Sequence, residues 1–175
     1  MYSEFAQKSI VKGTIDNRDI EWILTSDDVE LLPLLQAAYM VRSKYFENKV
    51  KIHILNNVQS GGCSEDCRYC AQSSESKNKT AIYPMKNDEE ILLEAKQAYE
   101  AGAYRHCMVF SGRDLGNRRI EKICSVIKKI KSQFPMEICV SAGFLTREDA
   151  DKLVAAGVNR YNHNLNTSST YYPKA

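Results

Sequence analysis

The sequence lacks the features that would place a protein in a membrane or outside the cell. No apolar run reaches the length of about 18 residues that a transmembrane helix needs, so we expect no membrane span. The N-terminal residues 1–8, MYSEFAQK, contain no apolar core of a secretory signal. Outside an oxidising compartment, clustered cysteines indicate metal binding or catalysis rather than disulfides. The expected location is the cytoplasm.

The sequence also lacks an excess of charge of either sign. Lys and Arg number 24 against 22 Asp and Glu, so the net charge of +2 does not indicate a nucleic-acid partner. There is no low-complexity segment and no repeat of fixed sequence. A chain of 175 residues with 43% hydrophobic and 26% charged residues is sufficient for a soluble domain with a core.

Strands and helices are expected to alternate through most of the chain. The expected strands are 51–57, 105–111, 137–141 and 160–166, and the expected helices are 88–102, 117–133 and 146–156. This alternation predicts βαβ units and a parallel sheet, in either a doubly wound α/β fold or a (β/α)8 barrel. Residues 1–48 are expected to form a helical extension, with Ser26 as an N-cap and a break or restart at Pro33. Residues 49–175 then hold the sheet.

Three cysteines follow the first expected strand at the spacing C-x3-C-x2-C. Cys63, Cys67 and Cys70 provide one thiolate fewer than a closed tetrahedral metal site requires. Cysteine-rich runs of this kind hold iron–sulfur clusters. A zinc site with a distant fourth ligand, such as His163, is an alternative interpretation.

The spacing resembles the signature of radical S-adenosylmethionine (SAM) enzymes, and the flanking residues GGCSEDCRYCAQS resemble biotin synthase. This resemblance implies a TIM-type (β/α)8 barrel, of which the chain holds about four βα units. It also implies that Cys63, Cys67 and Cys70 hold a [4Fe–4S] cluster while SAM binds the fourth iron. Tyr69, between two of the ligands, would pack near the adenine.

A second motif lies in residues 161–168, YNHNLNTS, and is similar to another biotin synthase segment. The resemblance implies that Asn164 contacts SAM and the substrate dethiobiotin, and that Asn166 binds the SAM ribose, where many relatives carry Asp. Strand alternation puts Asn162, Asn164 and Asn166 on one face, which is expected to line the barrel interior. The other face, with Tyr161, His163 and Leu165, is expected to point toward the helices.

The remaining cysteines divide into a pair and a single residue. Cys107 and Cys139 match family ligands of a second cluster, [2Fe–2S], that would donate sulfur; its other ligands, a Cys and an Arg, would lie beyond residue 175. Without the resemblance, both would be buried core thiols. Arg105 shares the face of Cys107 and would be a charged neighbour. Cys124 lies among isoleucines on the apolar face of a helix and should pack as a small hydrophobe.

The resemblance as a whole implies the N-terminal half of biotin synthase, which inserts sulfur into dethiobiotin to make biotin. It further implies an electron donor such as flavodoxin or ferredoxin, and a homodimer when the protein is full length. The fragment alone is expected to be inactive. Alternatives are another radical SAM enzyme, of the hydrogenase maturase or methylornithine synthase type, or a zinc-binding structural module.

Overall fold

The computed structural model describes residues 1–78 and 80–171, and the chain divides into two compact units, Met1–Val50 and Lys51–Ala175. The first unit is helical. It contains α1 (Tyr2–Lys12), α2 (Asn17–Thr25) and α3 (Leu31–Phe46). A small aromatic cluster of Tyr2, Phe5 and Trp22 joins α1 to α2, with ring centroids 6.1 to 6.2 Å apart.

The break between α2 and α3 differs from the expected one. Ser26 ends α2, and its N–H donates to the Trp22 carbonyl at 3.0 Å, so the prediction that Ser26 starts a helix is wrong. The next helix begins only at Leu31. Pro33 therefore lies in the first turn of α3, where the amide that proline lacks would have no helical partner.

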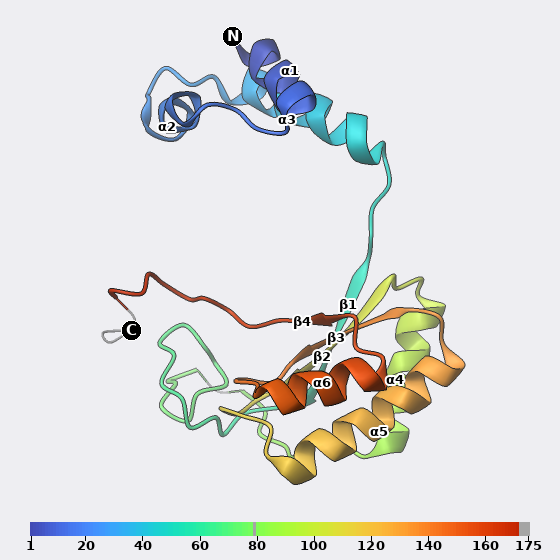
Figure 1. The fold of residues 1–175 in the computed structure, drawn as a ribbon. Helices are drawn as coiled ribbons and strands as arrows, with labels where there is room; N and C mark the ends of the chain where they lie inside the picture. The colour runs from blue at the N-terminus through green and yellow to red at the C-terminus, as the bar shows by residue number, and fades with distance from the viewer. Residues whose placement is uncertain (79, 172–175) are drawn as a thin grey trace. The chain divides into compact units, whose positions relative to one another are not determined.

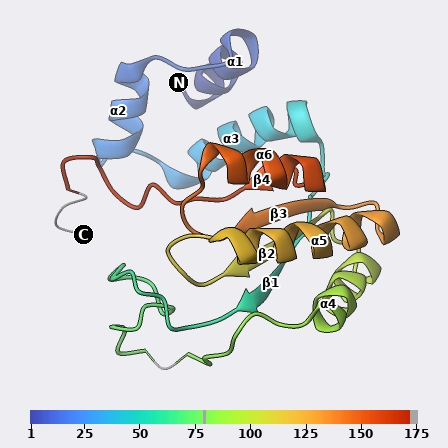
Figure 2. The same ribbon diagram turned by 60° about the horizontal axis from the view of Figure 1, so that its bottom comes forward.

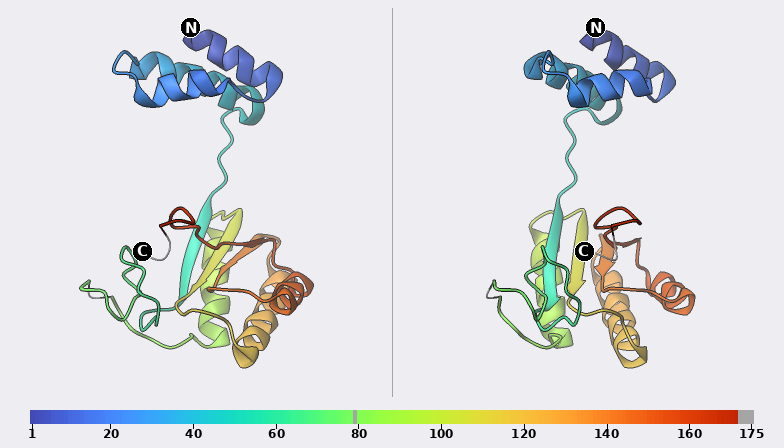
Figure 3. Two further views of the ribbon diagram at one scale, coloured as in Figure 1. Left: turned by 60° about the vertical axis from the view of Figure 1, so that its left-hand side comes forward. Right: turned by 90° about the vertical axis from the view of Figure 1, so that its left-hand side faces the viewer.

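The second unit is a parallel sheet covered by three helices. The strands β1 (His53–Gln59), β2 (Arg105–Phe110), β3 (Glu137–Ser141) and β4 (Arg160–Tyr161) lie in the order β1-β2-β3-β4. The helices α4 (Asp88–Glu100), α5 (Asn117–Gln133) and α6 (Arg147–Ala156) all lie on one side of the sheet (Figures 1 and 3). The predicted parallel α/β fold is confirmed. No helix in the described part of the chain has the length and apolar content to span a membrane.

Two of the covering helices begin with a reciprocal cap. Asn87 Oδ1 accepts from the N–H of Glu90 at 2.9 Å, and the Glu90 carboxylate accepts from the N–H of Asn87 at 2.9 Å. Thr146 and Asp149 form the same arrangement before α6. Each cap satisfies amides that the first helical turn leaves unpaired, which explains why both helices start where the sequence predicts.

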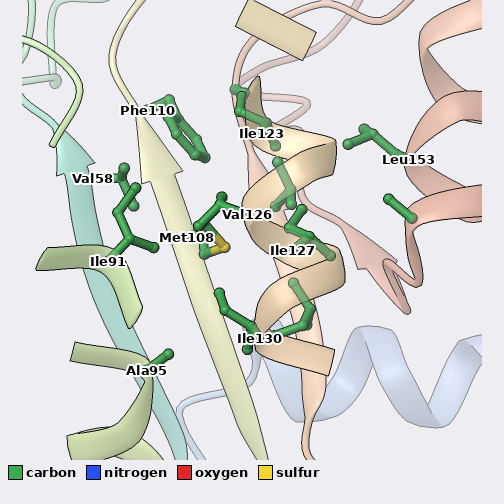
Figure 4. Close-up of a cluster of buried hydrophobic side chains, with 14 of the residues drawn as sticks. Val58, Ile91, Ala95, Met108, Phe110, Ile123, Val126, Ile127, Ile130 and Leu153 are labelled. Carbon is green, nitrogen blue, oxygen red and sulfur yellow. The ribbon is translucent and has the colours of Figure 1, made fainter. Parts of the chain in front are cut away.

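The core lies between the sheet and the three helices. The strand residues Met108 and Phe110 pack against the isoleucines of α5 (Figure 4). Val140 belongs to the same buried cluster. The other labelled members of the cluster are Val58, Ile91, Ala95, Ile123, Val126, Ile127, Ile130 and Leu153. Cys124 packs at the margin of this core and stays half-buried, and its burial raises the pKa of the thiol.

Strand alternation separates this core from a second, open face of the sheet. Along β2, His106, Met108 and Phe110 are buried while the residues between them are only half-buried. Cys107 and its neighbours of the same parity therefore lie on the face away from the helices. The expected faces of β2 and β3 agree with this arrangement.

The fourth strand is much shorter than expected. β4 ends at Tyr161, and the N–H of Asn162 makes a last sheet-like bond to the Val140 carbonyl at 2.8 Å. Beyond it the chain is extended without a strand partner among the described residues, so the alternation ends. Leu165 is 81% exposed, and His163 is exposed with its ring centroid 4.9 Å from that of Phe144. The prediction that both point toward the helices is wrong, whereas Tyr161 does pack on the core.

Candidate cofactor site

The loop with the three cysteines lies where the strands end. Because all four strands are parallel, the loops that follow them gather at one edge of the sheet. Figure 2 shows the long connection between β1 and α4 at the arrowhead end of β1. In α/β barrels this edge is where catalytic sites are built.

A double glycine turns the chain from β1 into the cysteine loop. Gly61 and Gly62 have φ angles of 72° and 61°, in the left-handed region that favours glycine. A Cβ on Gly61 would lie 2.6 Å from Cγ1 of Ile82, so a side chain does not fit there. The Gly61 carbonyl also accepts a buried hydrogen bond from Ser111 Oγ at 2.8 Å. The backbone that leads into Cys63 is therefore held by its close approach to Ile82 and by the hydrogen bond from Ser111.

Backbone hydrogen bonds fold the cysteine segment back on itself. The Cys63 N–H donates to the Gln72 carbonyl at 3.0 Å, and the Ser74 N–H donates to the Cys63 carbonyl at 2.9 Å. A turn joins the Cys70 N–H to the Cys67 carbonyl at 2.8 Å. All three thiols are free and half-buried. The three thiols thus stand in one folded loop, and none of them is in a disulfide.

Cys67 is affected by burial and by the other two cysteines of the loop. Burial raises the pKa of Cys67, and the charges of Cys70 and Cys63 act in the same direction. A bound metal reverses this effect, because it stabilises the deprotonated thiolate. Within residues 1–78 and 80–171, no group of three or more His, Cys, Asp or Glu side chains stands where it could hold a single metal ion. The donor set, three thiols from one loop, fits three iron positions of a [4Fe–4S] cluster.

Tyr69 links the cysteine loop to the segment after β4. Its hydroxyl donates a hydrogen bond to Asn166 Oδ1, although the two residues are 97 positions apart in the sequence. Asn166 has a φ of 48°, and both side chains are exposed at the edge of the sheet. Asn164 lies exposed in the same segment. The structure therefore joins Tyr69 and Asn166, two of the three residues predicted to bind SAM.

Cys107 and Cys139 lie side by side on the open face of the sheet. They are register partners on β2 and β3, in a row that continues to Arg160 on β4. Burial raises the pKa of Cys139 to about 11, and the adjacent Cys107 thiol acts in the same direction. Arg105 and Arg160 oppose this rise. The two thiols thus lie near two cations, Arg160 in the same row and Arg105 two residues before Cys107 on β2.

The sequence reasoning missed what holds Arg105 in place. Its Nε donates to Glu137 Oε2 at 2.9 Å, and Tyr104 donates to the other oxygen at 2.8 Å. The Arg105 guanidinium also lies 3.3 Å from Nε2 of His53. His53, Arg105 and Glu137 are register partners across β1, β2 and β3. The sequence carried one signal of this ion pair, because Arg105 and Glu137 have opposite charges and each begins an expected strand.

These features agree with a family match over most of the second unit. Residues 57–175 match the Radical SAM superfamily, and the chain belongs to that superfamily.

The similar curated proteins are biotin synthases. That of Magnetococcus marinus is 56% identical over 150 residues, which cover 86% of this chain and 47% of the relative. Those of Leptospira interrogans and Halalkalibacterium halodurans are 47% and 43% identical, covering 82% and 97% of this chain but 41% and 51% of the relatives. The chain therefore spans about half the length of the curated relatives it matches.

Two solved structures share the fold. HydG, a maturase of the [FeFe]-hydrogenase, superposes with a TM-score of 0.71 at 23% identity, over 91% of this chain and 36% of that one. Methylornithine synthase (PylB) gives 0.75 at 20% identity, over 90% of this chain and 46% of that one. At such identities the likeness concerns the fold alone.

Proposed function

We propose that the chain is the N-terminal half of a biotin synthase, a radical SAM sulfurtransferase that converts dethiobiotin to biotin. The observation that carries the proposal is the presence of two thiol sets in one sheet unit. Cys63, Cys67 and Cys70 lie in the loop after β1, and Cys107 and Cys139 lie in register on the open face. The identities of 41% to 56% to curated biotin synthases support the same reaction.

The cysteine loop is proposed to hold the cluster that starts the reaction. Cys63, Cys67 and Cys70 would each bind one iron, and the position without a protein ligand is left for SAM. When bound, the cluster supplies the electron that cleaves SAM to the 5′-deoxyadenosyl radical. The protein then has to orient SAM and exclude water. The bond between Tyr69 and Asn166 supports this role, because it places a ring and an amide together beside the thiols.

The substrate-facing residues are proposed to lie in the segment after β4 and on the open face of the sheet. Asn164 would contact SAM and dethiobiotin, and Asn166 the SAM ribose. Cys107 and Cys139 would hold a [2Fe–2S] cluster, the source of the inserted sulfur. Two nearby cations, Arg105 and Arg160, support this assignment, because they favour negative charge on thiolate ligands.

The whole protein would need further components. The remaining ligands of the second cluster would come from the other half of the barrel. An electron donor such as flavodoxin or ferredoxin would reduce the first cluster, and the full-length protein would be a cytoplasmic homodimer. The hydrogenase maturase and methylornithine synthase alternatives share the fold at only 23% and 20% identity. A zinc module is disfavoured by the match to the Radical SAM superfamily.

The test is SAM cleavage by single-cysteine variants. Cys63→Ala, Cys67→Ala and Cys70→Ala should each abolish release of 5′-deoxyadenosine after anaerobic reconstitution and addition of dithionite. Cys124→Ala serves as the matched control and should retain release. If the 175-residue chain is inert, the same substitutions are made at the equivalent positions of the Magnetococcus marinus relative. Normal release from any of the three loop variants would contradict the assignment.

A further inference from the structure

An ion pair ties the middle of the cysteine loop to a neighbouring loop. Glu65 lies between Cys63 and Cys67, and its carboxylate accepts from Arg113 Nη1 at 3.0 and 3.2 Å. Arg113 belongs to the loop after β2. Within the described residues, no backbone-to-backbone hydrogen bond reaches positions 64 to 66. The Glu65 side chain is therefore what anchors this short segment to the rest of the protein.

Arg113 is itself held by the loop after β3. The Phe144 N–H donates to the Arg113 carbonyl at 2.7 Å, and the guanidinium lies 5.5 Å from the centroid of the Phe144 ring, within the range of a cation–π contact. Gly143 has a φ of 82°, and a Cβ there would come within 2.1 Å of the Arg113 carbonyl oxygen. Only glycine allows this close approach. Phe144 in turn contacts the ring of His163.

These contacts form a continuous series, Glu65–Arg113–Phe144–His163, across the loops after all four strands. They lie outside the thiol sets, and Glu65, Arg113 and Phe144 have no role in the function proposed above. Glu65 joins this series to the cysteine loop, within two positions of both Cys63 and Cys67.

We propose that Arg113 is a positioning residue that fixes the Cys63–Cys67 segment through Glu65, so that the loop is ordered before a cluster binds. The inference depends on the proposed function only in that the thiols are taken to bind an iron–sulfur cluster. Arg113 acts by charge and ring contact with two other loops. An ordered loop loses less conformational freedom when it binds its ligand, which favours binding.

Charge reversal tests the positioning role directly. Hydrogen exchange of peptides covering residues 61–76 is measured by mass spectrometry in the iron-free 175-residue chain. Arg113→Glu and Glu65→Arg should each speed exchange about two- to fivefold, the range expected for loss of a partly exposed ion pair. The double variant, with the charges exchanged, should return toward the wild-type rate. Arg147→Glu, which alters the exposed pair with Asp151 on α6, is the control and should change nothing in these peptides.

Two further measurements keep the result interpretable. Arg113→Gln removes the charge without reversing it, and circular dichroism checks that each variant is folded. Unchanged exchange in Arg113→Gln and both reversals, or no rescue in the double variant, would overturn the proposal. Iron bound per chain after anaerobic reconstitution is measured in parallel and should fall in the single variants and recover in the double variant. If exchange is rescued in the double variant but the wild-type chain binds no iron, the role of Arg113 is supported and only the cluster assignment is contradicted.

Discussion

His106 is predicted to make the protein less stable in mild acid. Its side chain is 1% exposed on the helix-facing side of β2, beside a cavity of about 280 Å³ that Asn56 and Glu94 also line. Burial lowers the pKa of His106 from 6.5 to about 4, and the charge of Glu94 opposes this only in part. The folded protein therefore keeps a neutral imidazole where the unfolded chain takes up a proton.

The sign and size of the effect follow from proton linkage. Because the folded pKa is depressed, the contribution of His106 is fully present above pH 6.5 and is lost as the pH falls toward 4. A difference of that size corresponds to about 3 kcal/mol once both states are protonated. At about pH 5.5, the expected loss from this residue is about 1 kcal/mol.

The assay compares urea unfolding of the wild type with His106→Phe and His106→Gln at about pH 7.5 and 5.5. Both variants lack the titrating group, so each should lose about 1 kcal/mol less than the wild type between the two pH values. Only His106→Phe should also gain stability at the higher pH, because it removes buried polar atoms from the core. Carboxylates with lowered pKa, such as Asp149, titrate equally in all three proteins. An equal loss in all three would refute the reasoning.

Three further predictions concern the cysteines and the length of the chain. Cys124→Ala should cost about 1 kcal/mol of unfolding free energy through lost packing, as thermal unfolding would show, and a loss of SAM cleavage would contradict its structural role. In a full-length protein, Cys107→Ala and Cys139→Ala should keep SAM cleavage but lose the second cluster and biotin formation, which iron analysis and biotin yield would detect. Residues 1–175 alone should form no biotin from dethiobiotin, because the chain spans only about half the length of its curated relatives; a monomeric preparation that makes biotin would show otherwise.

Local signals in the sequence were sufficient for most of the second unit. The bounds expected for α5 and β3 agree with Asn117–Gln133 and Glu137–Ser141. Caps, proline stops and apolar periodicity act within a few residues, so they are visible without the fold. Strand parity also predicted the faces of Cys107 and Cys139, whereas their side-by-side position depends on the register of β2 and β3.

Features that depend on neighbouring strands were not predictable in this way. The segment after Tyr161 carries an alternating pattern but has no partner strand among the described residues, so it remains irregular. The contacts of Glu137 with Arg105 and of Tyr69 with Asn166 depend on register and loop position. Ser26 shows a further ambiguity, because a serine before acidic residues can end one helix as well as start another.

Cys63, Cys67 and Cys70 are proposed to hold an iron–sulfur cluster together. The most direct test is iron and sulfide analysis of protein purified and reconstituted without air, with the absorption spectrum recorded on the same sample. We expect a brown protein with about four iron and four sulfide per chain, which are lost when any one of these cysteines is replaced by alanine. A colourless protein that binds zinc, or one whose iron is unaffected by all three substitutions, would contradict it.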